Sequence, residues 1–236
     1  MIDLHSHVLP CVDDGSASVE ESATLLRMEA EQGIRCVVAT PHFYANYDDP
    51  QQFLSKRAEA MALLQREIPE KHELPEIKLG AEVHYFHGMS DSDVLQRLTI
   101  DMKRCILIEM PGTPWTDQMY RELEQIRSKQ DLIPIIAHVD RYISRFRTFG
   151  IPEKLEQIPV LVQANASFFL NRATSSMALR MLRKNQIHLL GSDCHSVRHR
   201  PPRLGEAVEL IRKRLGEEPL AQIQDYQSLV FSHDKE

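Results

Sequence analysis

The chain begins with MIDLHSHVLPCVDDG (residues 1–15), a short apolar segment whose polar side chains are of the kinds that bind metal ions. In an extended strand alternate side chains point to the same face, so His5 and His7 would lie side by side. A His-x-His pair alone is weak evidence, because many such histidines only satisfy local hydrogen bonds. More such residues follow later apolar runs, namely His42, Glu82, Glu109, His138, Asp193 and His195. Packing favours apolar residues at such positions, so their recurrence indicates a metal site.

Apolar runs of strand length alternate with amphipathic segments along the chain. We expect strands at residues 2–7, 36–40, 77–83, 105–110, 133–138, 160–164 and 187–192, with helices between them. Nearly continuous apolar strands that alternate with helices are typical of a parallel sheet covered by helices, and their number suits a closed or nearly closed barrel. A doubly wound open sheet is the alternative. Either α/β fold binds ligands at the carboxyl ends of its strands, where the candidate metal ligands stand.

The sequence also marks the ends of several helices. The motif Ser18-x-x-Glu21 resembles a capping box, and Gly33 would end the helix that it opens. Asp49-Pro50 suits the N-cap and the first position of a helix that runs to about residue 68. The last long helix is expected at about 204–215, and a polar tail follows Phe231.

Composition and charge exclude several classes of protein. The 236 residues are 42% hydrophobic and 26% charged, as in ordinary globular domains, which excludes disordered and fibrous classes. The net charge of −6 and the lack of a basic block argue against a nucleic-acid partner. The sequence has neither a signal-peptide pattern nor an apolar run of bilayer length, so we expect a cytoplasmic protein without direct membrane insertion. Its four cysteines are widely spaced, which fits a reducing compartment.

Seven short motifs occur in order along the chain: Asp3-Leu4-His5-Ser6-His7, Val12-Asp13-Asp14-Gly15, Thr40-Pro41-His42, Gly80-Ala81-Glu82, Ala137-His138-Val139-Asp140-Arg141-Tyr142, Gly191-Ser192-Asp193-Cys194-His195 and Arg200-Pro201-Pro202. Together they resemble the motif series of the polymerase-and-histidinol-phosphatase (PHP) superfamily. Within it, the chain is most similar to the bacterial manganese-dependent protein-tyrosine phosphatases of capsule and exopolysaccharide operons. The resemblance covers nearly the whole chain. It implies a distorted (β/α)7 barrel, with a single PHP phosphatase domain at residues 1–231 and a polar C-terminal tail at residues 232–236.

The resemblance also implies a row of three metal ions and assigns their ligands by motif position. The first ion would be held by His5, His7 and Asp193. Glu82 would bridge it to the second ion, completed by Glu109 and His138. The third would be held by Asp14, His42 and His195. A donor set of imidazoles and carboxylates without a thiolate suits manganese, iron or zinc, and the resemblance favours Mn²⁺.

The reaction implied by the resemblance is the hydrolysis of phosphotyrosine. Clustered divalent ions neutralise the charge of the phosphate and lower the pKa of a bridging water, so that hydroxide can attack in line near neutral pH. Arg141 and Arg200 would clamp the phosphate, a task that the planar guanidinium suits. The substrate would be a phosphotyrosyl protein, the tail of a membrane-bound tyrosine kinase that regulates polysaccharide synthesis. A tyrosine phenolate, with a pKa of about 10, needs little proton assistance to leave, and either Asp140 or a metal-bound water would supply any proton.

Other functions stay open at this stage. A small-molecule phosphatase such as histidinol-phosphate phosphatase would use nearly the same ligands, although such relatives tend to carry His at the positions of Asp14 and Glu109. A polymerase-associated exonuclease and a non-enzymatic metal-binding scaffold are further alternatives. Cys194 and Arg200 also have the Cys-x5-Arg spacing of cysteine-dependent tyrosine phosphatases. The residues between them lack a glycine-rich phosphate cradle, so we expect Cys194 to be a small residue that lines the metal pocket.

Several polar residues have simpler interpretations. Asp3 is expected to hydrogen-bond to a ligand histidine or to nearby backbone rather than to bind metal. Asp13-Asp14-Gly15 alone would indicate a turn, but the flanking histidines favour a metal role for Asp14. Cys11 stands where relatives usually have glycine. The remaining histidines match no ligand position and are expected to be ordinary surface or core residues: His72, His84, His87, His188, His199 and His233.

Overall fold

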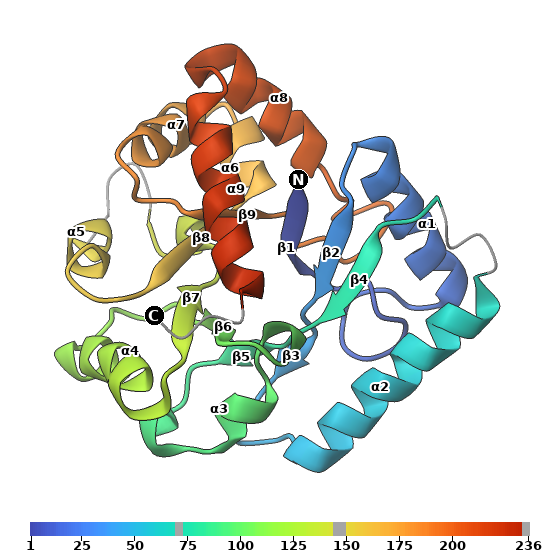
Figure 1. The fold of residues 1–236 in the computed structure, drawn as a ribbon, viewed down its shortest axis with the longest axis horizontal. Coiled ribbons are helices and arrows are strands. Elements are labelled where there is room, and N and C mark those ends of the chain that lie inside the picture. Colours follow the sequence, from blue (N-terminus) through green and yellow to red (C-terminus); the bar gives the residue numbers. More distant parts are fainter. Residues whose placement is uncertain (69–72, 144–149, 233–236) are drawn as a thin grey trace.

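The structure is a computed structural model that describes residues 1–68, 73–143 and 150–232. Its centre is a curled sheet in which the strand pairings are parallel (Figure 1). The strands are β1 (Ile2–Ser6), β2 (Cys36–Ala39), β3 (His42–Phe43), β4 (Glu76–Leu79), β5 (Glu82–His84), β6 (Cys105–Glu109), β7 (Ile133–Ile136), β8 (Leu161–Asn165) and β9 (Leu189–Gly191). Their hydrogen-bonded order is β1-β2-β4 in one part and β3-β5-β6-β7-β8-β9 in the other.

Two interrupted strands explain why the sheet has two parts. Thr40-Pro41 separates β2 from β3, and Gly80-Ala81 separates β4 from β5. A proline has no amide hydrogen to give to the ladder, so the pairing is broken there. The amide of Glu82 nevertheless donates to the carbonyl of Pro41 at 3.0 Å, and the halves follow one path. The strand expected at 36–40 is confirmed as β2, and β3 continues its path beyond the break, whereas the strand expected at 77–83 is two shorter segments, β4 and β5.

The outer strands of the curled sheet meet, which closes the barrel. The amide of Asp193 donates to the carbonyl of His5 at 2.8 Å, and that of His7 donates to the carbonyl of Cys194 at 2.9 Å. The segment after β9 thus pairs in parallel with β1. With each interrupted strand counted once, the ring has the seven strand positions expected. The fold is the predicted distorted (β/α)7 barrel and not the doubly wound open sheet.

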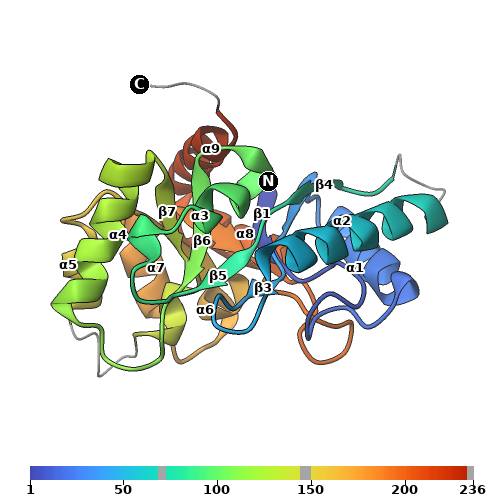
Figure 2. The same ribbon diagram turned by 90° about the horizontal axis from the view of Figure 1, so that it is seen from below.

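Helices surround the strands (Figure 2). The α-helices are α1 (Val19–Glu31), α2 (Pro50–Glu67), α3 (Val94–Arg97), α4 (Asp117–Gln130), α5 (Ile151–Leu155), α6 (Ala166–Leu170), α7 (Ser175–Arg183), α8 (Leu204–Leu215) and α9 (Glu218–Phe231). The 3₁₀ helices are η1 (Met89–Asp91), η2 (Ile100–Met102) and η3 (Val139–Arg141). In the described part of the chain, no helix combines the length and the apolar character that crossing a bilayer demands.

The helix signals in the sequence are confirmed at α1 and α2. The hydroxyl of Ser18 accepts the amide proton of Glu21, and the carboxylate of Asp49 accepts that of Gln52. These contacts satisfy amides that the first turn of a helix leaves without a partner. Gly33 follows α1 with φ of +77°, the left-handed conformation that glycine adopts readily.

Helix α9 was not expected from the sequence, where the last long helix was placed at 204–215. It follows α8 directly and buries Leu220, Ile223 and Val230. Gln227 interrupts this apolar stripe, and its side chain bonds both the amide and the carbonyl of Ile2. The helix therefore covers the amino end of β1, where its stripe joins the core (Figure 1). Residues 233–236, most of the expected tail, lie outside the described residues.

A bulge in β1 lets one strand serve both the core and the site. The pairing with β2 shifts between Asp3 and Ser6, so β1 has one residue more than its partner there. Such a bulge breaks the alternation of faces. Leu4 consequently packs in the apolar interior with Val38 and Leu107, while the ring of His5 still reaches the polar end of the barrel.

Candidate metal centre

All nine predicted ligand residues come together at one end of the barrel, where β1, β6, β7 and β9 end and where β2 and β4 continue, after a break, into β3 and β5. They are His5 and His7 from β1 and its end, Asp14 from the following loop, His42 at the start of β3, Glu82 at the start of β5, Glu109 at the end of β6, His138 after β7, and Asp193 and His195 after β9. We refer to these nine residues as the cluster. Most of their side chains are buried, whereas that of Asp14 is 70% exposed and borders the opening of the site.

The pair that the first motif predicts lies at the centre of the cluster. His5 Nε2 and His7 Nε2 are 3.1 Å apart. His5 Nε2 lies 3.3 Å from Glu82 Oε2 and 3.5 Å from Asp193 Oδ1. His7 Nε2 lies 3.4 and 3.6 Å from the same two oxygens. Four donor atoms from three strands thus surround one point.

Glu82 connects this group with two others. Its Oε1 is 2.6 Å from His138 Nε2, which in turn lies 3.5 Å from Glu109 Oε1. Its Oε2 is 2.9 Å from His42 Nδ1. One buried carboxylate therefore faces donors on both sides, the position expected for a bridging ligand.

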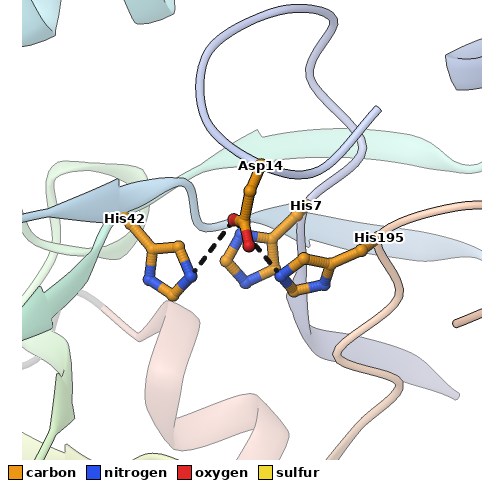
Figure 3. Close-up of side chains that lie close together, drawn as sticks. All are labelled: His7, Asp14, His42 and His195. Carbon is orange, nitrogen blue, oxygen red and sulfur yellow. Dashed lines mark ion pairs between the residues drawn. The ribbon is translucent and has the colours of Figure 1, made fainter. Parts of the chain in front are cut away.

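A further group lies at the outer side of the cluster and is drawn in Figure 3. Asp14 Oδ1 is 3.4 Å from His42 Nε2 and 3.6 Å from His195 Nε2, with the ring of His7 beside them. These four side chains offer donor atoms that all lie within 4.8 Å of one another.

Four histidines are held by hydrogen bonds at Nδ1 while Nε2 faces the cluster. The Nδ1 partners are Gln163 Oε1 for His5 (3.3 Å), Asp13 Oδ2 for His7 (2.6 Å), the hydroxyl of Tyr142 for His138 (3.3 Å) and the carbonyl of Asp193 for His195 (3.0 Å). Histidines that bind metals are typically held in this way, because the Nδ1 contact fixes the tautomer and orients the ring.

The cluster has the chemistry of a metal site. Among the described residues, Glu82 Oε2, Asp193 Oδ1 and His195 Nε2 are buried without a hydrogen-bond partner. Buried polar atoms without a partner are costly unless something else binds them. Donors that share a tetrahedral ion at about 2.0–2.1 Å lie about 3.3 Å apart, close to the separations found here. The residues present therefore fit divalent cations.

Two cluster residues have a backbone conformation that is uncommon outside glycine. The φ angles of His138 and Asp193 are +31° and +53°. Such conformations tend to occur at functional sites, where surrounding contacts hold them. Gly191 stands two residues before Asp193, and a Cβ atom added to it would lie 2.6 Å from His5 Cβ and 2.8 Å from Gln163 Nε2. The GSDCH motif thus needs glycine there so that β9 can approach His5.

Burial and neighbouring charges shift the pKa values of several cluster residues. Burial disfavours a charge on His7, yet Asp13 and Glu82 raise its pKa to about 10. Burial likewise disfavours the charge of Asp193, but His5 and Arg141 hold the pKa of that carboxyl well below its usual range. For His195, burial and the nearby His7 lower the pKa to about 4. The Asp193 carboxylate therefore stays ionised, as a cation ligand must be.

Arg141 and Arg200 lie at the rim and point to the cluster. The Nη2 atom of each is 2.6 Å from Asp193 Oδ2, and Arg141 Nη1 is 3.1 Å from Glu109 Oε1. Both side chains are about two-fifths exposed, 39% for Arg141 and 41% for Arg200. Two guanidinium groups are thus available to an anion that enters from solvent.

Cys194 does not line the metal pocket as expected. Its buried thiol lies instead with the carboxylates of Asp3 in β1 and Glu29 in α1. Burial and these two carboxylates raise the pKa of the Cys194 thiol well above its usual value. A thiolate is needed for nucleophilic attack, so this environment opposes the cysteine mechanism. Asp3 itself accepts the amide protons of His5 and Ser192, which confirms its expected bonding to backbone.

Several residues that position the cluster were not singled out from the sequence. Besides binding His5, Gln163 Oε1 accepts the amide proton of His138 at 2.6 Å, and Asn165 Nδ2 donates to Asp193 Oδ2 at 2.8 Å. Both stand at alternate positions of the otherwise apolar strand β8. Two polar residues on one face of a buried strand are the signal that would have identified them.

The other histidines differ in their surroundings. His84 borders the cluster, with its Nδ1 3.3 Å from Glu109 Oε2. His87 and His199 are exposed, and His188 accepts the amide proton of Val162 within the barrel wall. His72 and His233 lie outside the described residues.

Comparison with known proteins identifies the family. The family described as capsular polysaccharide synthesis, CpsB/CapC, matches residues 1–228. The tyrosine-protein phosphatase CpsB of Streptococcus agalactiae serotype III is 28% identical over 99% of both chains. A solved structure superposes on this chain with a TM-score of 0.84 at 25% identity, covering 98% of this chain and 94% of that one. It comes from work on YwqE of Bacillus subtilis and CpsB of Streptococcus pneumoniae, which are described as unique metal-dependent tyrosine phosphatases. Histidinol phosphate phosphatase of Lactococcus lactis shares the fold, with a TM-score of 0.56 at 14% identity over 92% of this chain and 93% of its own. The chain belongs to the CpsB/CapC family of capsular polysaccharide synthesis proteins.

Proposed function

We propose that this protein is a metal-dependent protein-tyrosine phosphatase that hydrolyses phosphotyrosine. The observation that carries the proposal is the convergence of four Nδ1-anchored imidazoles with buried carboxylates at one end of the barrel. Family membership and the metal-dependent tyrosine phosphatases among its relatives support the same activity. The activity belongs to a single PHP phosphatase domain at residues 1–231.

We assign the nine cluster residues as ligands of three Mn²⁺ ions, with iron or zinc as alternatives of similar ligand preference. His5, His7 and Asp193 would hold the first ion; Glu82 would bridge to the second, with Glu109 and His138; and Asp14, His42 and His195 would hold the third. When bound, such ions would neutralise the charge of a phosphate monoester. They would also lower the pKa of a metal-bound water towards neutrality, so that hydroxide is available near neutral pH.

Arg141 and Arg200 bind the phosphoryl oxygens in this proposal. Their guanidinium groups already point to the cluster, each 2.6 Å from Asp193 Oδ2. A planar guanidinium donates two parallel hydrogen bonds to a phosphate, which orients the group as well as attracting it. The two arginines therefore position the phosphorus atom over the cluster.

The leaving group needs little help from the protein. A tyrosine phenolate has a pKa of about 10 and departs more readily than an alkoxide. Asp140 is one candidate proton donor, and burial raises the pKa of its carboxyl. Its Oδ1 also accepts the amide proton of Asn165 at 3.0 Å, which holds β8 next to η3, so the proton donor is either this carboxyl or a metal-bound water.

The protein substrate is the phosphotyrosyl tail of a membrane-bound tyrosine kinase that regulates capsular or exopolysaccharide synthesis. This part of the proposal rests on the family resemblance and on the capsule-synthesis description of the family. The cytoplasmic location and the absence of a nucleic-acid partner remain predictions from the sequence.

An assay with three substrates tests the proposed function. The purified protein is incubated with a phosphotyrosyl peptide, histidinol phosphate or single-stranded DNA, each with Mn²⁺ and with a chelator. We expect rapid hydrolysis of the peptide with Mn²⁺ and loss of activity on chelation. Faster turnover of histidinol phosphate than of the peptide would contradict the assignment to phosphotyrosine.

Two variants separate the metal mechanism from the cysteine mechanism. His138→Ala removes a cluster side chain and should abolish most turnover. Cys194→Ser replaces a thiol that lies with Asp3 and Glu29 and should retain most of it. Activity that survives chelation but is lost in Cys194→Ser would overturn the metal mechanism. Arg141→Ala should mainly raise KM, since the arginine binds the phosphoryl group in both ground and transition states.

A further inference from the structure

A cavity of about 520 Å³ is lined in part by Arg141 and Tyr142, whose side chains also contact cluster residues. We call it the aromatic cavity; six of the residues that line it are Pro111, Trp115, Tyr120, Arg141, Tyr142 and Lys154. It is open to solvent and has no part in the ligand set proposed above. An enclosed apolar cavity of about 150 Å³ is enough to bind benzene, so a phenyl group fits here easily.

Aromatic rings in mutual contact form the walls of this cavity. The ring centroids of Trp115 and Tyr142 are 5.0 Å apart at an interplanar angle of 63°, an edge-to-face contact. Trp115 and Tyr120 are 5.6 Å apart. The indole Nε1 of Trp115 donates to the carbonyl of Pro111 at 3.1 Å, which fixes the ring. Walls of this kind are preorganised to pack against another aromatic ring.

Two residues belong both to the aromatic cavity and to the surroundings of the cluster. Arg141 lines the cavity and also contacts Glu109 and Asp193. Tyr142 lines the cavity and also holds His138 through a hydrogen bond to Nδ1. A phosphoryl group bound by Arg141 would therefore have its substituent beside the aromatic walls. Only the ester oxygen separates the phosphorus from the ring in an aryl phosphate.

We propose that the aromatic cavity binds the phenyl ring of the phosphotyrosyl group, and that Trp115 is a specificity-determining residue for aryl over alkyl phosphates. The inference rests on the proposed phosphatase function. Lys154, which also lines the cavity, has its Nζ 4.6 Å from the centre of the Tyr120 ring and 3.1 Å from Asp117 Oδ1, so this cation is already paired. The discrimination thus comes from the rings rather than from net charge.

Tyr44, near the cluster, is the alternative position at which the phenyl ring of the substrate could bind. Tyr44 is 36% exposed, and its ring lies 5.5 Å from that of His42 and 5.4 Å from that of His84. Tyr44 offers a single, partly exposed ring, whereas the aromatic cavity offers several walls around a defined volume. More contact area is buried by a ring in the cavity, which favours it over Tyr44.

The fluorescence of Trp115, the single tryptophan of the chain, reports directly on the cavity. Phenylphosphonate is a suitable probe because its phosphorus–carbon bond resists hydrolysis, and methylphosphonate is the matched alkyl control. In the Mn²⁺-loaded protein, phenylphosphonate should change the tryptophan emission with a midpoint equal to its inhibition constant. Methylphosphonate and inorganic phosphate should leave the emission unchanged at concentrations that inhibit turnover.

Variants test the same inference by inhibition. Trp115→Ala should weaken inhibition by phenylphosphonate about tenfold, the loss expected for one aromatic contact, and leave that by methylphosphonate within twofold. Trp115→Phe should restore most of the preference. Tyr47→Ala removes an exposed aromatic residue outside the cavity and should change neither constant.

The inference is overturned if phenylphosphonate inhibits without changing the emission of Trp115, or if Tyr44→Ala rather than Trp115→Ala removes the aryl preference. It is also overturned if phenylphosphonate binds no better than methylphosphonate. Failure of the proposed function is a different result: phosphotyrosine would not be hydrolysed with any divalent cation, whereas the fluorescence titration would still report whether an aryl phosphonate enters the cavity.

Discussion

Asp13 should control the metal affinity of the site although it is not among the proposed ligands. Its Oδ2 is 2.6 Å from His7 Nδ1 and accepts the amide proton of His42 at 3.0 Å, while its Oδ1 accepts that of Gly15 at 3.0 Å. The Asp13→Asn variant keeps the shape but loses the charge. Its amide group can also serve only one of these two acceptor positions, since the NH₂ end would face a donor.

The size of the effect follows from the hydrogen bond to His7. A hydrogen bond to a charged group contributes about 1.5–3 kcal/mol and a neutral one about 0.5–1.5 kcal/mol. The loss of about 1.4 kcal/mol corresponds to about a tenfold weaker binding constant. Replacing residues that hold a metal-binding histidine typically costs about 10–100-fold in affinity or activity. We expect the Mn²⁺ concentration for half-maximal activity to rise about 10–100-fold, with kcat largely recovered at saturating Mn²⁺.

Calorimetric titration of metal-free protein with Mn²⁺, together with activity at graded Mn²⁺, measures this effect. Asp49→Asn is the matched control, because Asp49 only caps α2 and asparagine caps a helix equally well. An unchanged metal dependence in Asp13→Asn would refute the reasoning, as would an equal shift in the control.

Three further predictions concern stability. Gly191→Ala should lower the free energy of unfolding by about 1–3 kcal/mol, because the added Cβ would lie 2.6 Å from His5 Cβ. Gly112→Ala is the control and should have little effect, because nothing lies within 4 Å of a Cβ built there. Urea unfolding of both variants measures the difference. Burial lowers the pKa of His188 from 6.5 to about 4, so the fold keeps this ring neutral while the unfolded chain takes up a proton near pH 6.5. The free energy of unfolding should therefore fall by about 3 kcal/mol as the pH falls from about 6.5 to about 4, and His188→Gln should reduce that pH dependence in denaturant titrations. Cys11 has φ of +59°, which glycine adopts without strain, so Cys11→Gly should raise the melting temperature slightly; a lower melting temperature would contradict this explanation.

The order of the strands and their ends could be predicted because their apolar runs are continuous and bounded by turn residues. Barrel closure could not, since it depends on backbone pairing between the segment after β9 and β1, far apart in the sequence. The continuation of the strand path beyond Pro41 into β3 and the break at Gly80 were also missed, because only the pairing with neighbouring strands shows where each path breaks and resumes. Helix α9 was missed because Gln227 interrupts its apolar stripe to bind Ile2.

The cluster residues could be named from the sequence, but the residues that hold them in place could not. The cluster follows strand ends and resembles a known motif series, so its members were named from the sequence. Gln163 and Asn165 were not, because their partners come from other strands and only the folded chain brings them together. The prediction that Cys194 lines the metal pocket was wrong for a related reason. Asp193 has φ of +53°, so the side chain of the next residue does not follow the simple alternation of a strand.

The proposed function requires the cluster to be a metal centre, and a crystal structure of the protein grown with Mn²⁺ is the decisive test. Anomalous scattering at the manganese edge should show three ions among the nine cluster residues, next to the Nε2 atoms of His5, His7, His138 and His195. Anomalous peaks elsewhere, or none at the cluster in a preparation that still hydrolyses phosphotyrosine, would contradict it.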